Sequence, residues 1–347
     1  MSKNLWQPSL IVKKNSNLFA FENYISKKLK IKFYRNYKKL LNWSIKNSPE
    51  FWSRFWDFSK IKGIKSNKNF RKSKTFYKNL FLPGSRLNFG ENLLSKNNNE
   101  KAVTFISENG FREERSWRQL NLNTNKISKF LKKINIKKGD RVAAYMPNTI
   151  ETVEAFIATT SLGGIWSSCS PDFGSKGVIE RFSQINPKVL FITDQYFYNG
   201  KKIDVLNRLP EILKLIPSIK SVVISNYPGK KFIKNKYKFR KINLFKWNEL
   251  MQTNTEKIDF KRFDFETELA ILYSSGTTGK PKCICHRSGG VLIQHMKEHQ
   301  LHCNIKENDN VFYFTTCGWM MWNWLVSSLA SRASIVLFDG SPMFKSA

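Results

Sequence analysis

Long apolar runs are missing from this sequence of 347 residues. The N-terminal stretch, MSKNLWQPSLIVKKNSNLFAF, interrupts each short apolar run with a polar or charged residue, so it lacks the core of a signal peptide. No stretch approaches the roughly 20 apolar residues that a membrane helix needs. We therefore expect a soluble protein without a signal peptide.

Cysteine is scarce, and its spacing forms no disulfide framework. The five cysteines are an odd number, which favours reduced thiols and a cytoplasmic location. They are Cys169, Cys283, Cys285, Cys303 and Cys317.

Acidic residues are few: 26 Asp and Glu stand against 59 Lys and Arg, which gives a formal net charge of +33. The basic residues are mostly lysine and are spread from end to end, and only residues 59–78 resemble a basic tail. Proteins that bind nucleic acid usually gather Lys and Arg on one face or in one tail. Spread charge is typical of a solvated surface, so nucleic-acid binding stays the less favoured alternative.

Two common nucleotide-binding motifs are absent. There is no G-x-G-x-x-G, and G-x-x-x-x-G-K-[ST] fails because Ser274 stands at its first glycine and Pro281 at its hydroxyl position. What is present is YSSGTTGKPK, residues 273–282, whose first residue ends the apolar run LAILY. Its glycines permit positive φ and a close approach of a ligand, while its hydroxyls, backbone N–H groups and lysines can bind phosphate. A plain glycine–serine turn between two strands is the structural alternative.

The chain is long enough for two or three domains, or for one large α/β domain with an extension. Before about residue 95 it is aromatic and basic. In FWSRFWDFSK, residues 51–60, aromatic residues recur at helical spacing, which predicts a helix that packs its aromatic stripe on the next domain. From residue 102 onward, apolar runs rich in β-branched residues alternate with helical patterns, which predicts a sheet covered by helices.

The predicted strands begin at Arg141, Lys188, Ser221, Leu269, Asn310 and Ser334. The predicted helices are residues 150–162, 178–185, 204–216, 290–300 and 321–331, with Pro210 as a candidate interruption of the third.

The stretch YSSGTTGKPK, placed after a strand, resembles the phosphate-binding loop of the adenylate-forming superfamily. Other stretches are similar to one branch of that superfamily, the acetoacetyl-CoA synthetases, and the similarity runs from Leu5 to Met343. Among them are LPGSRLNFGENLL from Leu82, IWSSCSPDFG from Ile165, VIERFSQINPKVLF from Val178 and CGWMMWNW from Cys317.

This resemblance implies an α/β fold, the layered sheet-and-helix large N-terminal domain of an adenylate-forming enzyme. Residues 1–95 would be a helical N-terminal extension, and residues 96–347 an incomplete AMP-binding domain. The implied activity is that of an acid–thiol ligase: acetoacetate and ATP form an acyl-adenylate and pyrophosphate, and the thiol of coenzyme A then displaces AMP. ATP, Mg²⁺ and coenzyme A are the implied cofactors. A ligase for another short acid, such as acetate or propionate, is the alternative.

The resemblance also assigns three groups of site residues. The ATP phosphates would be bound by Ser274, Ser275, Gly276, Thr277, Thr278, Gly279, Lys280 and Lys282. The acyl pocket would be lined by Gly318, Trp319, Met320 and Met321. The nucleotide of coenzyme A would dock at Tyr198, Asn199, Gly200 and Lys201. For Trp322 and Trp324, ordinary packing on the sheet explains the sequence at least as well.

A competing pattern lies among the histidines. HMKEH, residues 295–299, satisfies the zinc-binding pattern H-x-x-E-H, with two histidines one helical turn apart. Five-residue patterns arise by chance, and in the resembled family the helix after the phosphate loop is an ordinary packing helix. We therefore expect no metal here. The residues concerned are His286, His295, His299 and His302, near Cys283, Cys285 and Cys303.

Members of the resembled family are about twice as long. No residue here matches their magnesium-binding glutamate, their ribose-binding aspartate or the adenylation lysine of their small C-terminal domain, so no catalytic residue is assigned. We expect an incomplete gene model, a decaying gene, or a split enzyme whose second half is a separate chain, and no ligase activity from these 347 residues alone. Arg332 replaces a small residue, usually glycine, at a helix-to-strand turn, which predicts strain.

Overall fold

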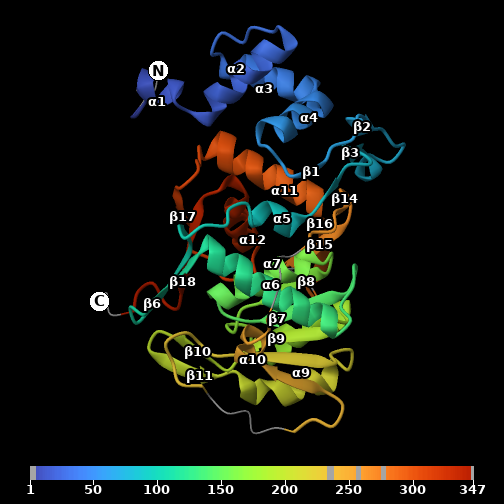
Figure 1. The fold of residues 1–347 in the computed structure, drawn as a ribbon, viewed down its shortest axis with the longest axis vertical. Coiled ribbons are helices and arrows are strands. Elements are labelled where there is room, and N and C mark those ends of the chain that lie inside the picture. Colours follow the sequence, from blue (N-terminus) through green and yellow to red (C-terminus); the bar gives the residue numbers. More distant parts are fainter. Residues whose placement is uncertain (1–4, 233–237, 255–258, 275–278, 345–347) are drawn as a thin grey trace.

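The computed structural model describes residues 5–232, 238–254, 259–274 and 279–344. The elements are stacked along one long axis, with the first helices at one end and the β10–β11 hairpin (Gln195–Tyr198 and Lys201–Asp204) toward the other (Figure 1). No helix in these ranges is long and apolar enough to cross a membrane.

The chain begins with a group of helices that ends in an aromatic stripe. Phe55 and Trp56 of this stripe are buried. The ring of Phe55 lies 5.8 Å from Phe21, and that of Trp56 lies 6.2 Å from Phe265. The stripe therefore packs within the helical group as well as on the rest of the molecule, whereas the sequence predicted only the second contact. These helices are α1 (Leu10–Lys14), α2 (Asn17–Leu29), α3 (Tyr37–Lys46) and α4 (Ser48–Phe58).

Short strands connect this group to the main body. An antiparallel sheet in the order β1-β4-β14 joins residues near the start of the chain to the segment before residue 268. The bounds are β1 (Gly63–Ile64), β4 (Arg86–Leu87) and β14 (Phe263–Asp264), with the hairpin β2 (Phe70–Arg71) and β3 (Leu80–Phe81), the 3₁₀ turn η1 (Phe76–Lys78) and helix α5 (Phe89–Leu93).

The main sheet has seven strands in the order β13-β12-β9-β7-β8-β15-β16. The first six run parallel, and β16 is antiparallel to β15. In β7, Val142 and Ala144 face one apolar core while Ala143 and Tyr145 face the other, as the alternation of strand side chains requires. The bounds are β7 (Arg141–Tyr145), β8 (Ile165–Cys169), β9 (Val189–Thr193), β12 (Ser221–Ser225), β13 (Asn243–Lys246), β15 (Glu268–Ser274) and β16 (Lys282–Arg287).

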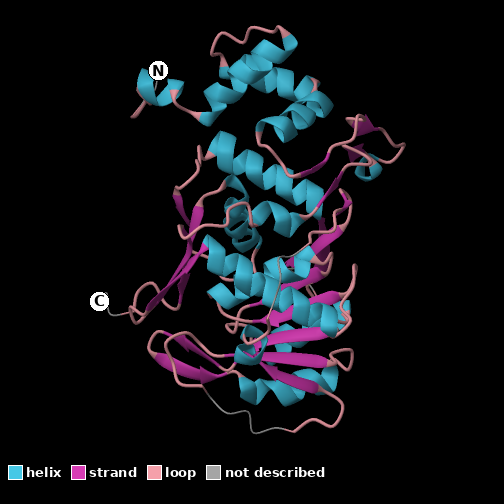
Figure 2. Ribbon diagram, viewed as in Figure 1, coloured by secondary structure: helices cyan, strands magenta, loops and turns pink. Residues whose placement is uncertain are grey.

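Helices cover both faces of this sheet (Figure 2). On one face lie α8 (Ser175–Ile185), the turn η2 (Leu206–Arg208) and α9 (Leu209–Leu215). On the other lie α6 (Trp117–Lys133), α7 (Ile150–Ser161) and α10 (Trp247–Met251). Every residue of α7 is buried, because this helix contacts both the main sheet at β8 and a second sheet at β5.

The second sheet has the order β17-β18-β5-β6. Its strands are β17 (Asn310–Phe312), β18 (Ser334–Asp339), β5 (Lys101–Ser107) and β6 (Arg112–Ser116). Beside it lie α11 (Ser288–Lys297), which continues into the π-helical turn η3 (Glu298–His302), and α12 (Met320–Ser327), which continues into the 3₁₀ turn η4 (Ser328–Ser331). The predicted layered α/β fold is confirmed.

Candidate active site

The β15–β16 hairpin carries the glycine-rich loop. Ser274 ends β15 and pairs with Lys282, the first residue of β16. Ser275, Gly276, Thr277 and Thr278 lie outside the described residues. Both the phosphate-loop prediction and the plain-turn alternative require this connection between two strands.

The two ends of the loop differ in their surroundings. Before the loop, the partly buried Tyr273 hydroxyl lies 3.0 Å from Ser167 Oγ, and this burial raises the pKa of Tyr273 above its usual value. After the loop, Gly279 has φ +96°, and a Cβ at this position would meet no atom within 4 Å. Lys280 and Lys282 are exposed. The chain therefore enters the loop from a partly buried, paired strand and leaves it through an open segment where the ammonium groups of Lys280 and Lys282 are accessible to an anion.

The predicted acyl-pocket segment lies across the carboxyl ends of β7 and β8. The buried Cys317 accepts a hydrogen bond from the Ser168 hydroxyl at its carbonyl (2.6 Å), and its thiol lies 2.9 Å from the carbonyl oxygen of Met146. An added Cβ on Gly318 would approach the Phe173 ring to 3.4 Å. Because β15 lies next to β8 and parallel to it, this segment and the start of the glycine-rich loop lie at the same carboxyl-terminal end of the sheet.

Side chains of α12 divide into outward and inward groups. Trp319 and Met320 are 52% and 47% exposed. Trp322 is fully buried and donates its indole N–H to Asn148 Oδ1 (2.9 Å), while the Trp324 ring lies 4.5 Å from the ring of His299. Two of the predicted pocket residues thus face solvent, and the two tryptophans for which packing was the alternative lie against other side chains.

The predicted coenzyme A residues form the tip of the β10–β11 hairpin. Tyr198, Asn199, Gly200 and Lys201 are all exposed. The hairpin is tied to the end of β8 by Tyr196, whose hydroxyl donates to Asp172 Oδ1 (2.6 Å). The structure therefore brings this hairpin to the same end of the sheet as the acyl-pocket segment.

A buried carboxyl group at this end escaped the sequence analysis. Asp339, the last residue of β18, accepts hydrogen bonds from the Asn148 backbone N–H (3.0 Å) and the Tyr227 hydroxyl (2.9 Å). Burial raises the pKa of Asp339 to about 7. An aspartate that ends an apolar strand and precedes a glycine is a signal that could have drawn attention to it.

Residues 92–347 match the family model of the AMP-binding enzymes. The chain belongs to the AMP-binding enzyme family. It is 39% identical to the acetoacetyl-CoA synthetase of Xenopus tropicalis over 99% of this chain and 52% of that protein. It is likewise 39% identical to the acetoacetyl-coenzyme A synthetase of Rhizobium meliloti (strain 1021), over 97% of this chain and 51% of that protein.

A solved structure with the same fold supports this family assignment. The acetoacetyl-CoA synthetase from Streptomyces lividans superposes with a TM-score of 0.91 at 31% identity, covering 99% of this chain and 52% of that one. The resemblance to this branch of the adenylate-forming enzymes is therefore confirmed. The chain spans about half the length of the relatives that it matches.

His295 and His299, the two histidines of the zinc-like pattern, serve as packing residues. His295 Nδ1 lies 2.9 Å from Ser327 Oγ, and His299 Nε2–H donates to the Trp324 carbonyl (3.0 Å). Burial lowers the pKa of His295 to about 4 and that of His299 to about 3, so both are neutral near pH 7. Within the described ranges, no group of three or more His, Cys, Asp or Glu side chains could hold a metal ion.

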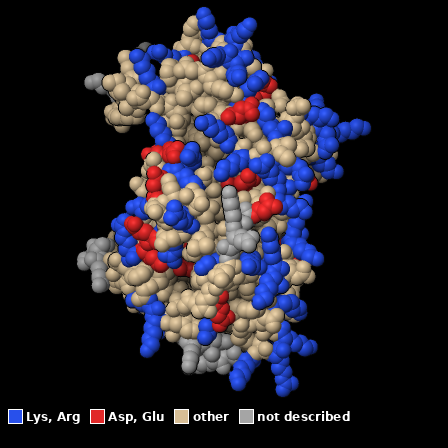
Figure 3. Space-filling model, viewed as in Figure 1, with Lys and Arg blue, Asp and Glu red and all other residues tan. Residues whose placement is uncertain are grey.

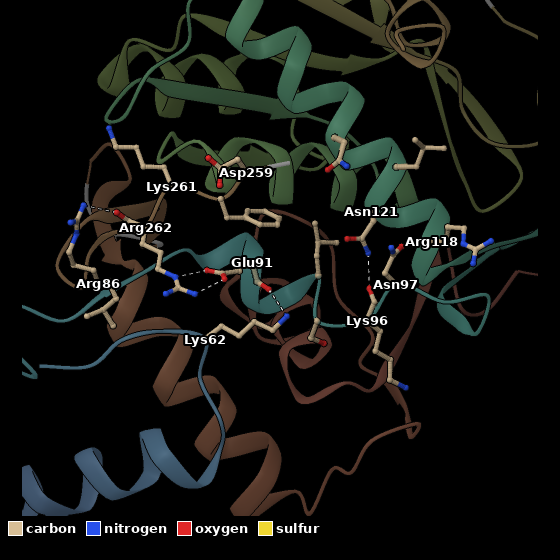
Figure 4. A pocket seen from close by; sticks show the side chains of 16 residues that line it. Lys62, Arg86, Glu91, Lys96, Asn97, Arg118, Asn121, Asp259, Lys261 and Arg262 are labelled. Atoms are coloured by element: carbon tan, nitrogen blue, oxygen red, sulfur yellow. Dashed lines mark hydrogen bonds and ion pairs between the residues drawn. The ribbon is translucent and has the colours of Figure 1, made fainter. Parts of the chain in front are cut away.

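A cleft of about 1190 Å³ lies elsewhere, between α5, α6 and residues 259–262 (Figure 4). In it Arg262 makes a two-pronged ion pair with Glu91 (2.9 and 3.0 Å), and Asn121 donates to the Lys96 carbonyl (2.9 Å). None of the described site residues predicted from the sequence lines this cleft. The cleft is therefore separate from the described residues that were predicted as site residues.

Proposed function

We propose that this chain supplies the acid- and ATP-binding part of an acetoacetate–CoA ligase. The observation that supports the proposal is that the predicted acyl-pocket segment and the predicted phosphate-loop hairpin both lie at the carboxyl ends of β8 and β15, in a chain with 39% identity to acetoacetyl-CoA synthetases over nearly its whole length. Ligands of open α/β sheets bind at such edges.

In the proposed reaction, a carboxylate oxygen of acetoacetate attacks the α-phosphorus of ATP. The bond from that phosphorus to the pyrophosphate oxygen breaks, which gives acetoacetyl-AMP. The thiolate of coenzyme A then attacks the acyl carbon, and AMP leaves. The first step depends on alignment and on neutralising the charge of the departing pyrophosphate. Lys280, Lys282 and the loop hydroxyls would provide that neutralisation.

Different groups would hold Mg²⁺ and coenzyme A. The described residues contain no group of three or more His, Cys, Asp or Glu side chains able to hold a metal ion. Mg²⁺ would be held mainly by the phosphates of ATP, as is usual for Mg²⁺ in nucleotide-binding sites. The resemblance assigns the nucleotide of coenzyme A to the exposed hairpin tip at Tyr198–Lys201, where a lysine and a tyrosine would suit a phosphate and an adenine ring.

Binding of ATP tests the phosphate loop. We expect Lys280→Ala and Lys282→Ala each to weaken Mg²⁺–ATP binding by about tenfold in calorimetry, the usual effect of losing one charged hydrogen bond to phosphate. Lys214→Ala is the matched control, because Lys214 is also an exposed lysine but lies on α9. Unchanged affinity in both loop variants would leave the plain-turn interpretation.

The acid is tested by exchange of labelled pyrophosphate into ATP with acetoacetate, acetate or propionate present. The assay is run on the 347-residue chain and on a fusion to the part of the Streptomyces lividans enzyme that it does not cover. We expect the fusion to prefer acetoacetate. A preference for acetate or propionate would reject the proposed substrate, and exchange by the chain alone would overturn the expectation that these residues are inactive by themselves.

A further inference from the structure

Glu108, the residue after β5, holds together two segments that are distant in the sequence. Its carboxylate accepts backbone N–H hydrogen bonds from Asn199 (2.7 Å), Gly200 (2.9 Å) and Ser341 (2.8 Å). Its own backbone N–H donates to the carbonyl of Asp339 (2.9 Å). One side chain thus joins the tip of the β10–β11 hairpin to the exit of β18.

The backbone of the hairpin tip is shaped to bind a negatively charged group such as the Glu108 carboxylate. Asn199 and Gly200 both have positive φ (50° and 74°) and donate adjacent N–H groups to the same carboxylate. Successive N–H groups in such turns form a concave anion-binding nest. The hairpin is a sheet of only two strands, and such hairpins are marginal on their own.

The segment after β18 also packs closely against the Glu108 side chain. Gly340 has φ +108°, and a Cβ at this position would lie 2.6 Å from Cβ of Glu108. A Cβ on Gly200 would lie 2.8 Å from the Phe344 ring. Both glycines are therefore required for the close approach of the two segments.

We propose that Glu108 is a positioning residue for the nucleotide of coenzyme A, an inference that rests on the proposed docking of that nucleotide at the hairpin tip. Glu108 fills the nest, so the N–H groups of Asn199 and Gly200 are not free to bind a phosphate. Recognition then falls on the side chains of Tyr198 and Lys201. Tyr198 is 45% exposed, and Lys201 has no ion-pair partner among the described residues.

The test compares Glu108→Gln and Glu108→Ala with the wild-type chain in titrations with coenzyme A and with Mg²⁺–ATP. We expect coenzyme A binding to weaken by about tenfold in Glu108→Gln and further in Glu108→Ala, because the charged hydrogen bonds are lost. ATP binding should stay within about twofold. Glu266→Gln is the control, since Glu266 pairs with the exposed Arg287 and touches neither segment.

Amide hydrogen exchange supplies a second measurement that needs no ligand. The amides of Asn199, Gly200 and Ser341 should exchange faster together in Glu108→Gln, while the core amide of Val223 in β12 is unchanged. Unchanged exchange at these three amides would overturn the inference, as would equal loss of ATP and coenzyme A binding, which is the signature of general unfolding.

Failure of the two proposals can be told apart. A wild-type chain that binds ATP but not coenzyme A would reject the docking assignment and this inference with it. A wild-type chain that binds coenzyme A with an affinity that Glu108→Gln retains would reject the inference alone.

Discussion

Arg332 holds a left-handed backbone conformation in the turn between η4 and β18, with φ 64°. Its guanidinium lies 3.2 Å from Glu307, but the two side chains are 51% and 44% exposed, so this ion pair contributes little. A left-handed conformation costs a residue with a Cβ about 1 kcal/mol relative to glycine. The strain predicted from the sequence therefore has a structural basis.

We expect Arg332→Gly to have a free energy of unfolding about 1 kcal/mol higher than Arg332→Ala, measured by urea denaturation. Both variants lose the ion pair, so their difference isolates the backbone. An alanine variant as stable as the glycine variant would show that the turn relaxes without cost.

Glu154 is a buried acid in α7 whose pKa is raised from 4.5 to about 8, chiefly by burial, although Arg115 at 3.5 Å acts in the opposite direction. Between these two values the folded chain keeps a proton that the unfolded chain has released. The free energy of unfolding must therefore fall as pH rises through this window.

Glu154→Gln should remove part of that fall. We expect the variant to lose less stability than the wild-type chain between about pH 5 and about pH 8, by a few kcal/mol at most. Glu114→Gln, at an exposed acid on the neighbouring strand, is the control and should keep the wild-type slope. Parallel pH profiles for Glu154→Gln and the wild type would mean that Glu154 is ionised throughout.

At the scale of elements, two tryptophans at the start of α12 have different expected roles: Trp322 packs in the core, and Trp319 belongs to the proposed acyl pocket. Trp322→Ala should lower the free energy of unfolding by about 3–5 kcal/mol, because it empties a fully buried site and leaves Asn148 without its indole partner. Trp319→Ala should change it by less than about 0.5 kcal/mol. Urea denaturation measures both.

Trp319→Ala also tests the proposed acyl pocket. Trp319→Ala should weaken acetoacetate use by the fusion protein while its fold is kept. If Trp319→Ala left acetoacetate use unchanged, the proposed pocket would have to be placed elsewhere.

Several elements could be predicted from the sequence because their patterns are local. Strands β7, β9, β12, β15 and β18 are apolar runs between polar residues, and each was predicted within one residue of its start. Strand β8, IWSSC, was missed because it is fully buried despite two serines. Their hydroxyls find partners only in the folded chain, at the carbonyls of Ile271 and Cys317.

Two other misses have different causes. Strand β16, KCICHR, is an exposed edge strand whose short apolar run is flanked by basic residues, so it lacks a strong apolar signal. Helix α6 did carry a signal that was not used: Ser116 and Gln119 form a capping box at its start. The helix predicted at residues 204–216 is divided: residues 206–208 form the 3₁₀ turn η2, and α9 begins only at Leu209. Pro210, the candidate interruption, lies in the first turn of α9, where proline is tolerated.

In the candidate site too, local features could be predicted from the sequence and contacts between distant segments could not. The order of residues in YSSGTTGKPK identified the phosphate loop as a candidate, since a motif is contiguous. The meeting of Glu108 with residues 199, 200 and 341 could not be predicted, because it joins three segments through backbone N–H groups that any sequence supplies. Contacts of this kind become visible only in the fold.

At the scale of the whole molecule, the net charge of +33 is spread over the surface. Figure 3 shows Lys and Arg over the full length of the visible face, with Asp and Glu in small groups. Such a distribution repels itself and destabilises the compact state. Salt screens the repulsion, with a Debye length of about 10 Å at 0.1 M.

We therefore expect the unfolding temperature to rise by several degrees when sodium chloride is raised from about 0.02 M to about 0.3 M. A variant in which the exposed Lys72, Lys74 and Lys78 are replaced by glutamine should unfold at a higher temperature than the wild type in low salt, and should gain less from added salt. Differential scanning calorimetry at a fixed pH measures both effects. If salt lowered the unfolding temperature instead, the ion pairs of the folded chain would outweigh its self-repulsion, and the excess of lysine would carry no cost in stability.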